Sequence, residues 1–264
     1  MAKRIELFPR DGESLAQYAK RLQYAIHRRI SKTVRQRHYL DNLVGPIGYW
    51  EPLQAYQFEF LKTMGLKPHH SLLDIGCGPL QGGIKLIEYL ECNHYTGIDL
   101  RPKTVTEAYR QVVRHDLAHK NPALVMSDSF GRHELPDRTF DFFWISQLLY
   151  HLSLDQIEDL FFQVASQMKP TSVFFGDIID YKPPSAPGIY WQEFKYHRHQ
   201  PEDLESTADN AGLSLTILGQ TGDFGYPEEL PLSTNYVLKI SPQVPAGLTP
   251  SSEDLEAQLL QTGV

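Results

Sequence analysis

The sequence is poor in cysteine and has no long hydrophobic run. Only two of its 264 residues are cysteines, Cys77 and Cys92, so it carries no disulfide framework and fits a reducing compartment. No hydrophobic run approaches the roughly 20 residues of a membrane-spanning helix. Residues 1–10 are charged and no uninterrupted hydrophobic segment follows them, so no secretory signal is predicted. We therefore expect a cytoplasmic protein whose residues, 41% hydrophobic, can bury one large core.

The net charge of −7 is unevenly distributed. Residues 1–40 contain ten Lys and Arg against three Asp and Glu, whereas the remaining residues contain fifteen against twenty-nine. Hydrophobic residues recur at helical spacing in the basic part and predict a helix over residues 13–36: Leu15, Ala19, Leu22, Ile26 and Ile30. This helix is either packed on the domain with a solvated basic face, or a site for an anionic substrate or partner. The acidic remainder opposes binding to nucleic acid.

A glycine-rich segment that follows a hydrophobic run is the most informative feature. Residues 72–83 read Leu-Leu-Asp-Ile-Gly-Cys-Gly-Pro-Leu-Gln-Gly-Gly, which predicts a strand, a tight loop and then a helix. Glycine lacks a Cβ, so Gly76 and Gly78 allow the backbone to approach a ligand closely. A second hydrophobic run ends in Asp99, and an acid about 20 residues beyond such a loop typically binds ribose hydroxyls. The two signals together predict a nucleoside ligand.

The same segment departs from a dinucleotide site. The pattern G-x-G-x-x-G requires a glycine where this chain has Gln81. Asp74 stands two residues before the first glycine, and its carboxylate would repel a pyrophosphate bound at a helix N-terminus. The same carboxylate suits a nucleoside that carries an ammonium and a sulfonium.

In Asp74, Gly76 and Gly78 the chain resembles the class I methyltransferases that use S-adenosylmethionine (SAM), whose first motif reads roughly acid-x-Gly-x-Gly-x-Gly. Leu80 stands at the third glycine, as in a branch of this superfamily that carries Gly-Cys-Gly-x-Leu-x-Gly-Gly. The resemblance covers roughly residues 53–240. It implies SAM as cofactor and a doubly wound α/β fold: a mostly parallel seven-stranded sheet with an antiparallel last strand, plus N-terminal helices.

Alternating strand and helix signals agree with that fold. We expect a basic N-terminal helical arm or lid over residues 1–52, a methyltransferase domain over 53–240, and a linker and tail over 241–264. Helices are predicted at 53–64, 82–90, 103–115, 155–168 and 201–211. Strands are predicted at 71–75, 94–98, 123–126, 140–145, 172–178, 213–218 and 233–240. The connection over 219–232 has no helical pattern, so the last two strands are expected to pair as a hairpin.

The resemblance also implies which residues contact the cofactor: Asp74, Gly76, Cys77, Gly78, Asp99, Leu100, Asp128, Ser129 and Ser146. Cys77 is interpreted as a small loop residue, because no motif pairs it with a histidine as a nucleophile would require. Asp128 either accepts a hydrogen bond from the adenine amino group or caps a turn.

Residues 146–149 narrow the classes of methyl acceptor that we expect. Relatives that methylate nucleobase or amide nitrogen usually carry Asn/Asp-Pro-Pro-Tyr here, and this chain has Ser-Gln-Leu-Leu. An oxygen acceptor usually needs a base, for which a histidine is suited. His151 is the first candidate, unless it only packs beneath a helix. His197 and His199 are the second, after the aromatic insert at 181–194. Their spacing does not indicate a metal site.

The leading hypothesis is therefore a SAM-dependent methyltransferase that acts on a small organic acceptor, most simply at oxygen. Nitrogen, carbon or sulfur acceptors stay open. A catalytically silent SAM-fold protein with a binding or regulatory role is an alternative, as is a nucleotide-sugar or NAD enzyme with an atypical glycine loop.

Overall fold

The computed structural model describes residues 14, 15, 18, 39–45, 48–179 and 196–243. The chain divides into two units, Met1–Trp50 and Glu51–Val264. In the first unit, helix α3 (Asp41–Val44) was not among the predicted helices, and the Asp41 carboxylate accepts a hydrogen bond from the Gly48 amide at 3.1 Å. The predicted helix over 13–36, the aromatic insert and the C-terminal tail fall almost wholly outside the described residues.

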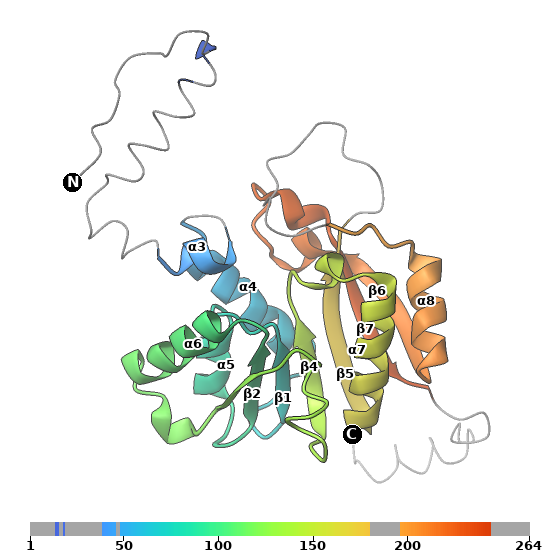
Figure 1. Cartoon of the computed structure of the whole chain (residues 1–264), viewed down its shortest axis with the longest axis horizontal. Helices are drawn as coiled ribbons and strands as arrows, with labels where there is room; N and C mark the ends of the chain where they lie inside the picture. The colour runs from blue at the N-terminus through green and yellow to red at the C-terminus, as the bar shows by residue number, and fades with distance from the viewer. Residues whose placement is uncertain (1–13, 16–17, 19–38, 46–47, 180–195, 244–264) are drawn as a thin grey trace, which may run out of the picture. The chain divides into compact units, whose positions relative to one another are not determined.

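The described part of the second unit contains a seven-stranded sheet in the order β3-β2-β1-β4-β5-β7-β6 (Figure 1). The strands are β1 (Leu72–Ile75), β2 (Tyr95–Asp99), β3 (Ala123–Met126), β4 (Phe140–Ile145), β5 (Met168–Ile178), β6 (Leu213–Gln220) and β7 (Tyr236–Pro242). Strands β1 to β5 pair in parallel, and β7 is inserted antiparallel between β5 and β6. The predicted fold class and the predicted hairpin are confirmed.

The helices follow the predicted alternation with strands. They are α4 (Trp50–Thr63), α5 (Gly83–Tyr89), α6 (Pro102–Arg114), α7 (Leu154–Gln167) and α8 (Pro201–Asn210). Helix α7 begins at Ser153, whose hydroxyl accepts from the Gln156 amide while the Gln156 side chain accepts from the Ser153 amide. This reciprocal cap satisfies two amides that a helix start would leave unpaired.

Four short 3₁₀ helices were not predicted: η1 (Ala118–Lys120), η2 (Leu149–His151), η3 (Thr221–Phe224) and η4 (Pro231–Thr234). Elements of three or four residues are too short to show a hydrophobic period. Two of them lie in the β6–β7 connection, which the sequence predicted to have no helix.

The two faces of the sheet are packed by different helices. Helices α7 and α8 cover the face that carries Leu73, Phe143 and Phe174, and together they form the main hydrophobic core. Helix α4 packs on the opposite face, where Phe60 meets Trp144 with ring centroids 5.2 Å apart. Burial on both faces explains why the parallel strands read as continuous hydrophobic runs.

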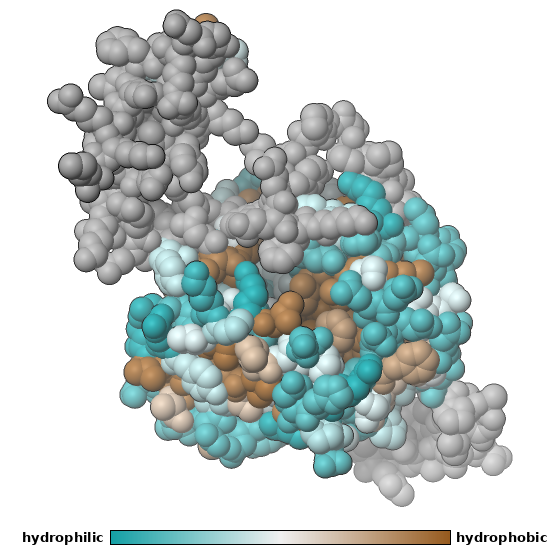
Figure 2. Space-filling view, in the orientation of Figure 1, coloured by the Kyte–Doolittle hydropathy of each residue, from teal (hydrophilic) through white to brown (hydrophobic). Residues whose placement is uncertain are grey.

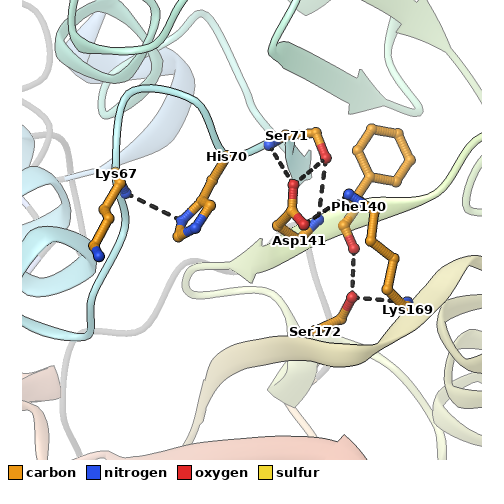
Figure 3. A network of polar contacts seen from close by, with 7 residues as sticks. All are labelled: Lys67, His70, Ser71, Phe140, Asp141, Lys169 and Ser172. Carbon is orange, nitrogen blue, oxygen red and sulfur yellow. Dashed lines mark hydrogen bonds and ion pairs between the residues drawn. The ribbon is translucent and has the colours of Figure 1, made fainter. Parts of the chain in front are cut away.

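A polar network ties the strands together at their amino ends (Figure 3). The Asp141 carboxylate accepts hydrogen bonds from the Ser71 amide and hydroxyl, both at 2.8 Å, and lies 2.6 Å from the Lys169 ammonium. Burial alone would raise the pKa of Asp141, but Lys169 and Ser71 outweigh it and lower the pKa to about 2. Asp141 is therefore an ionised clamp between β1, β4 and β5.

Hydrophobic residues gather in the middle of the face shown in Figure 2, with hydrophilic residues around them. Within the part of the chain that the structure describes, no helix combines the length and the hydrophobicity that a membrane crossing needs.

Candidate active site

The glycine-rich loop lies across the carboxyl ends of β1 and β2. The Gly76 and Cys77 amides both donate to the Ile98 carbonyl, at 2.8 and 3.0 Å. Gly76 and Gly78 have φ of 75° and 57°, which only glycine adopts without strain. A Cβ on Gly76 would lie 2.7 Å from Cδ2 of Leu148, so this loop also touches the residues that follow β4.

Leu80, at the third motif glycine, keeps a left-handed backbone with φ of 67°. Its side chain is fully buried and would lie 2.6 Å from a Cβ on Gly83. The departure from the motif therefore changes the side chain while the loop still turns through a left-handed conformation. Burial of the leucine offsets the roughly 1 kcal/mol or more that such a conformation costs.

Asp99 joins this loop to the end of β2. One carboxylate oxygen accepts from the Gly78 amide at 3.2 Å, and the other accepts from the Arg101 amide at 2.8 Å. The carboxylate is 7% exposed, whereas the neighbouring Leu100 is 64% exposed. The Arg101 side chain also donates from Nε, at 3.5 Å, to the oxygen that accepts from the Arg101 amide. Each carboxylate oxygen has two lone pairs, so the oxygen that accepts from Gly78 can still accept from a ribose hydroxyl.

Asp74 lies beneath the loop and is 4% exposed. Its Oδ2 accepts a hydrogen bond from the Tyr95 hydroxyl at 2.5 Å. Burial raises the pKa of Asp74 to about 7; the Tyr95 hydrogen bond opposes the rise and the charge of Asp99 adds to it. Burial also raises the pKa of Cys77, so its thiol stays protonated as expected of a loop residue.

At the end of β3, Ser127 rather than Asp128 caps the turn. The Ser127 hydroxyl accepts from the amides of Ser129 and Gly131 at 3.2 and 2.8 Å. Asp128 is exposed and Ser129 is half-buried. The Asp128 carboxylate is thus left for solvent or a ligand.

Asp177, near the end of β5, is a second buried acid, to which the sequence analysis assigned no role. Next to the half-buried Ser146, the amide of Gln147 donates to Asp177 Oδ1 at 2.6 Å. The side chain of Asn235 donates to Asp177 Oδ2 at 2.7 Å, and that of Gln147 donates to the Tyr226 hydroxyl at 3.0 Å. Burial raises the pKa of Asp177 to about 6, although the hydrogen bonds from the Gln147 amide and the Asn235 side chain oppose the rise.

The comparison with known protein families agrees with this geometry. A family model described as a methyltransferase domain matches residues 72–171, from β1 into β5. Residues 72–171 of the chain therefore form a methyltransferase domain.

Solved structures of low sequence identity share this methyltransferase fold. The CcbJ methyltransferase from Streptomyces caelestis is 14% identical, with 76% of this chain and 92% of that one covered at a TM-score of 0.56. Magnesium protoporphyrin IX methyltransferase from Synechocystis PCC 6803, with bound SAM, is 16% identical, with 84% and 97% covered at 0.55. The mitomycin 7-O-methyltransferase MmcR is 16% identical, with 74% and 55% covered at 0.52.

Three tyrosines of the methyltransferase surround the buried acid Asp177. Tyr56, Tyr150 and Tyr226 are each at most 5% exposed. The rings of Tyr56 and Tyr226 meet edge to face at 5.2 Å. Burial, and then the charge of Asp177, raise the pKa of all three, so their hydroxyls remain hydrogen-bond donors. The sequence does not indicate a role for Tyr56, Tyr150 and Tyr226, because no motif or hydrophobic period marks them.

The three candidate histidines lie close together but differ in their surroundings. His151 ends η2 and is half-buried, with its ring 4.6 Å from that of Tyr150 and 4.9 Å from that of Tyr196. His199 is 7% exposed, and its Nε2 bonds the Leu152 carbonyl at 3.0 Å. Burial lowers the pKa of His199. The ring of His197 stacks on that of His199 at 5.9 Å. Across the described ranges, no cluster of three potential ligands could hold a metal ion.

Proposed function

We propose that this methyltransferase transfers a methyl group from SAM to an oxygen of a small organic acceptor. The acceptor lies beside the carboxyl ends of β4 and β5, among Tyr56, Tyr150 and Tyr226. Aromatic rings and tyrosyl hydroxyls in one place suit a planar organic molecule that carries hydrogen-bond-accepting oxygens. MmcR, whose name gives it as an O-methyltransferase, supports the idea that this fold can serve such a reaction.

The loop geometry supports the following cofactor site. Asp99 would bind the ribose hydroxyls, Asp128 the adenine amino group, and Asp74 the positively charged end of the cofactor. Gly76, Cys77, Gly78, Leu100, Ser129 and Ser146 would line the remainder. When bound, SAM supplies a methyl group that is already activated by its sulfonium. The protein then has to orient the acceptor and accept its proton.

His151 is the base that we assign, and its position is the observation that carries this proposal. It ends η2, the short helix after β4, and its amide donates at 2.8 Å to the carbonyl of Leu148, the residue that meets the loop at Gly76. His199 is less suited because its Nε2 is held by the Leu152 carbonyl and burial opposes its protonation. His197 is stacked on His199 and stays the second candidate.

The division of the chain stays part of the proposal. Residues 53–240 would form the catalytic domain, the basic residues 1–52 an arm or lid that attracts an anionic group, and 241–264 a linker and tail.

A methyl-transfer assay with radiolabelled SAM tests the proposal on a panel of phenols, catechols, carboxylic acids, thiols and amines. We expect label on a hydroxyl compound. His151→Ala should then lower kcat by about 10²–10⁴-fold, the usual contribution of a general base, and leave SAM affinity unchanged. His119→Ala, at an exposed histidine away from this site, is the matched control.

The pH profile separates catalysis from packing. The pH–rate profile of the parent enzyme should show an acidic limb, as a reaction with a histidine base does, and that of His151→Ala should lack it. Label on amines alone, or a variant with a lower melting temperature and a normal kcat, would contradict the assignment.

A further inference from the structure

The buried carboxylate of Asp74 has a single hydrogen-bond donor within the described part of the protein. That donor is the Tyr95 hydroxyl, at 2.5 Å from Oδ2. Asp74 is 4% exposed, and no described group donates to its Oδ1. Oδ1 is not among the fully buried atoms that lack a partner, so it faces the little solvent that reaches Asp74, which is an unfavourable position for a charged oxygen. A ligand that supplies positive charge or a donor would complete the site.

Tyr95 reaches Asp74 because two small residues leave its path open. Tyr95 pairs with Leu72 across the β1–β2 ladder and Gly97 pairs with Asp74, so all four side-chain positions face one side of the sheet. A Cβ on Gly97 would lie 2.9 Å from Sγ of Cys77 and 3.1 Å from Cε1 of Tyr95. A Cβ on Gly83, at the start of α5, would lie 2.5 Å from the Tyr95 hydroxyl oxygen.

We propose that Tyr95 is a positioning residue for the cofactor: its hydroxyl keeps Asp74 ionised and oriented toward the positive charges of SAM. A side chain on Gly83 would displace that hydroxyl, and one on Gly97 would press on the Tyr95 ring and on Cys77. Gly83, the last glycine of the motif, thus makes room for a tyrosine rather than for the ligand directly. This inference rests on the proposed binding of SAM by Asp74.

The surroundings of Asp74 make its charge dependent on Tyr95. Burial raises the pKa of Asp74, Tyr95 opposes that rise, and the carboxylate of Asp99 reinforces it. Cys77, also nearby, is a neutral thiol. Near pH 7 the carboxyl is partly protonated, so a positively charged ligand that binds the ionised form should release protons. Without the hydroxyl, Asp74 should keep its proton to a higher pH.

Isothermal titration with SAM tests this at pH 7 and pH 9, in buffers of different ionisation enthalpy, on the full chain. Tyr95→Phe should weaken SAM binding about tenfold at pH 7, the loss expected for one charge-assisted hydrogen bond. It should also release more protons per SAM, and recover to within about twofold of the parent at pH 9. The amino group of SAM titrates alike with every variant, so the difference reports the protein.

Two further variants sharpen the result. Tyr89→Phe is the matched control, because it removes a hydroxyl that donates to an uncharged carbonyl, that of Leu66, at 3.2 Å. It should bind SAM as the parent does. Gly83→Ala should reproduce the effect of Tyr95→Phe, provided that its circular dichroism spectrum is native.

An equal loss at both pH values, or no loss, would overturn the role of Tyr95. Asp74→Asn tells this failure apart from failure of the proposed cofactor site. If Asp74→Asn weakens SAM binding and abolishes proton release while Tyr95→Phe does neither, Asp74 binds SAM without help from Tyr95. If Asp74→Asn also binds like the parent, Asp74 is not a SAM ligand and both proposals fail.

Discussion

Buried or half-buried acids at the two ends of the parallel strands differ in their partners and in the direction of their pKa shifts. At the amino ends, Asp141 has the Lys169 ammonium and two Ser71 donors, and its pKa falls to about 2. At the carboxyl ends, Asp74 and Asp177 have only uncharged donors, and burial raises their pKa values to about 7 and about 6. Neither of these two forms an ion pair with any residue that the structure describes.

This difference separates a structural site from a functional one. An acid that is fully paired contributes to stability and has nothing left to offer a ligand. A buried acid that is incompletely paired raises the free energy of the unliganded protein, which a positively charged ligand can recover. The carboxyl edge is also where doubly wound sheets bind their ligands.

The largest loss of SAM affinity is expected when a side chain blocks the glycine-rich loop at the carboxyl edge of the sheet. Gly78→Val puts a branched side chain on a backbone with φ of 57°, beside the Asp99 carboxylate. SAM affinity should fall at least about 100-fold, because the loop must move or lose its contact with the ligand. Isothermal titration measures this, with circular dichroism to show a native fold.

Gly65→Val is the control for strain alone. Gly65 has φ of 96° and open space around its Cβ position. It should lower stability and spare SAM binding. Normal SAM affinity in Gly78→Val would remove the loop from the site.

A smaller effect is expected at the amino edge. Asp141→Asn should destabilise the protein by roughly 1–2 kcal/mol at pH 7, because it loses the charge-assisted bonds to Lys169 and Ser71. The pKa of Asp141 is lowered in the folded state, so this stabilisation is present above about pH 4 and is lost as the pH falls toward 2. Urea unfolding at pH 7 and pH 3 checks it. A variant whose deficit is the same at both pH values would contradict the clamp.

The sequence predicted the sheet well and the site only in part. Strands such as β3 and β4 were located residue for residue, because hydrophobic runs that are buried on both faces are unmistakable. The loop and Asp99 were placed together by their spacing, and the structure joins them through the Gly78 amide.

The partners of Asp177 could not be found in this way. Asn235 and Tyr226 come from a connection without hydrophobic period, and only the sheet order brings them to Asp177. The left-handed backbone of Leu80 could not be predicted from the sequence either, because leucine rarely adopts this conformation. The sequence also could not tell that Ser127 rather than Asp128 caps the turn. Both are short polar residues, and only their side-chain geometry decides which one caps it.

The central claim is that the buried acid Asp74, at the carboxyl edge, costs stability until the cofactor binds, and Asp74→Asn tests it most directly. The folded pKa of Asp74 is raised, so unliganded stability should fall as the pH rises from about 4 through 7. Thermal unfolding at pH 8 should therefore show the unliganded variant more stable than the parent, by on the order of 2 kcal/mol. With saturating SAM the order should reverse, because the variant loses ligand stabilisation. A variant that is less stable without SAM and equally stabilised by it would contradict the account.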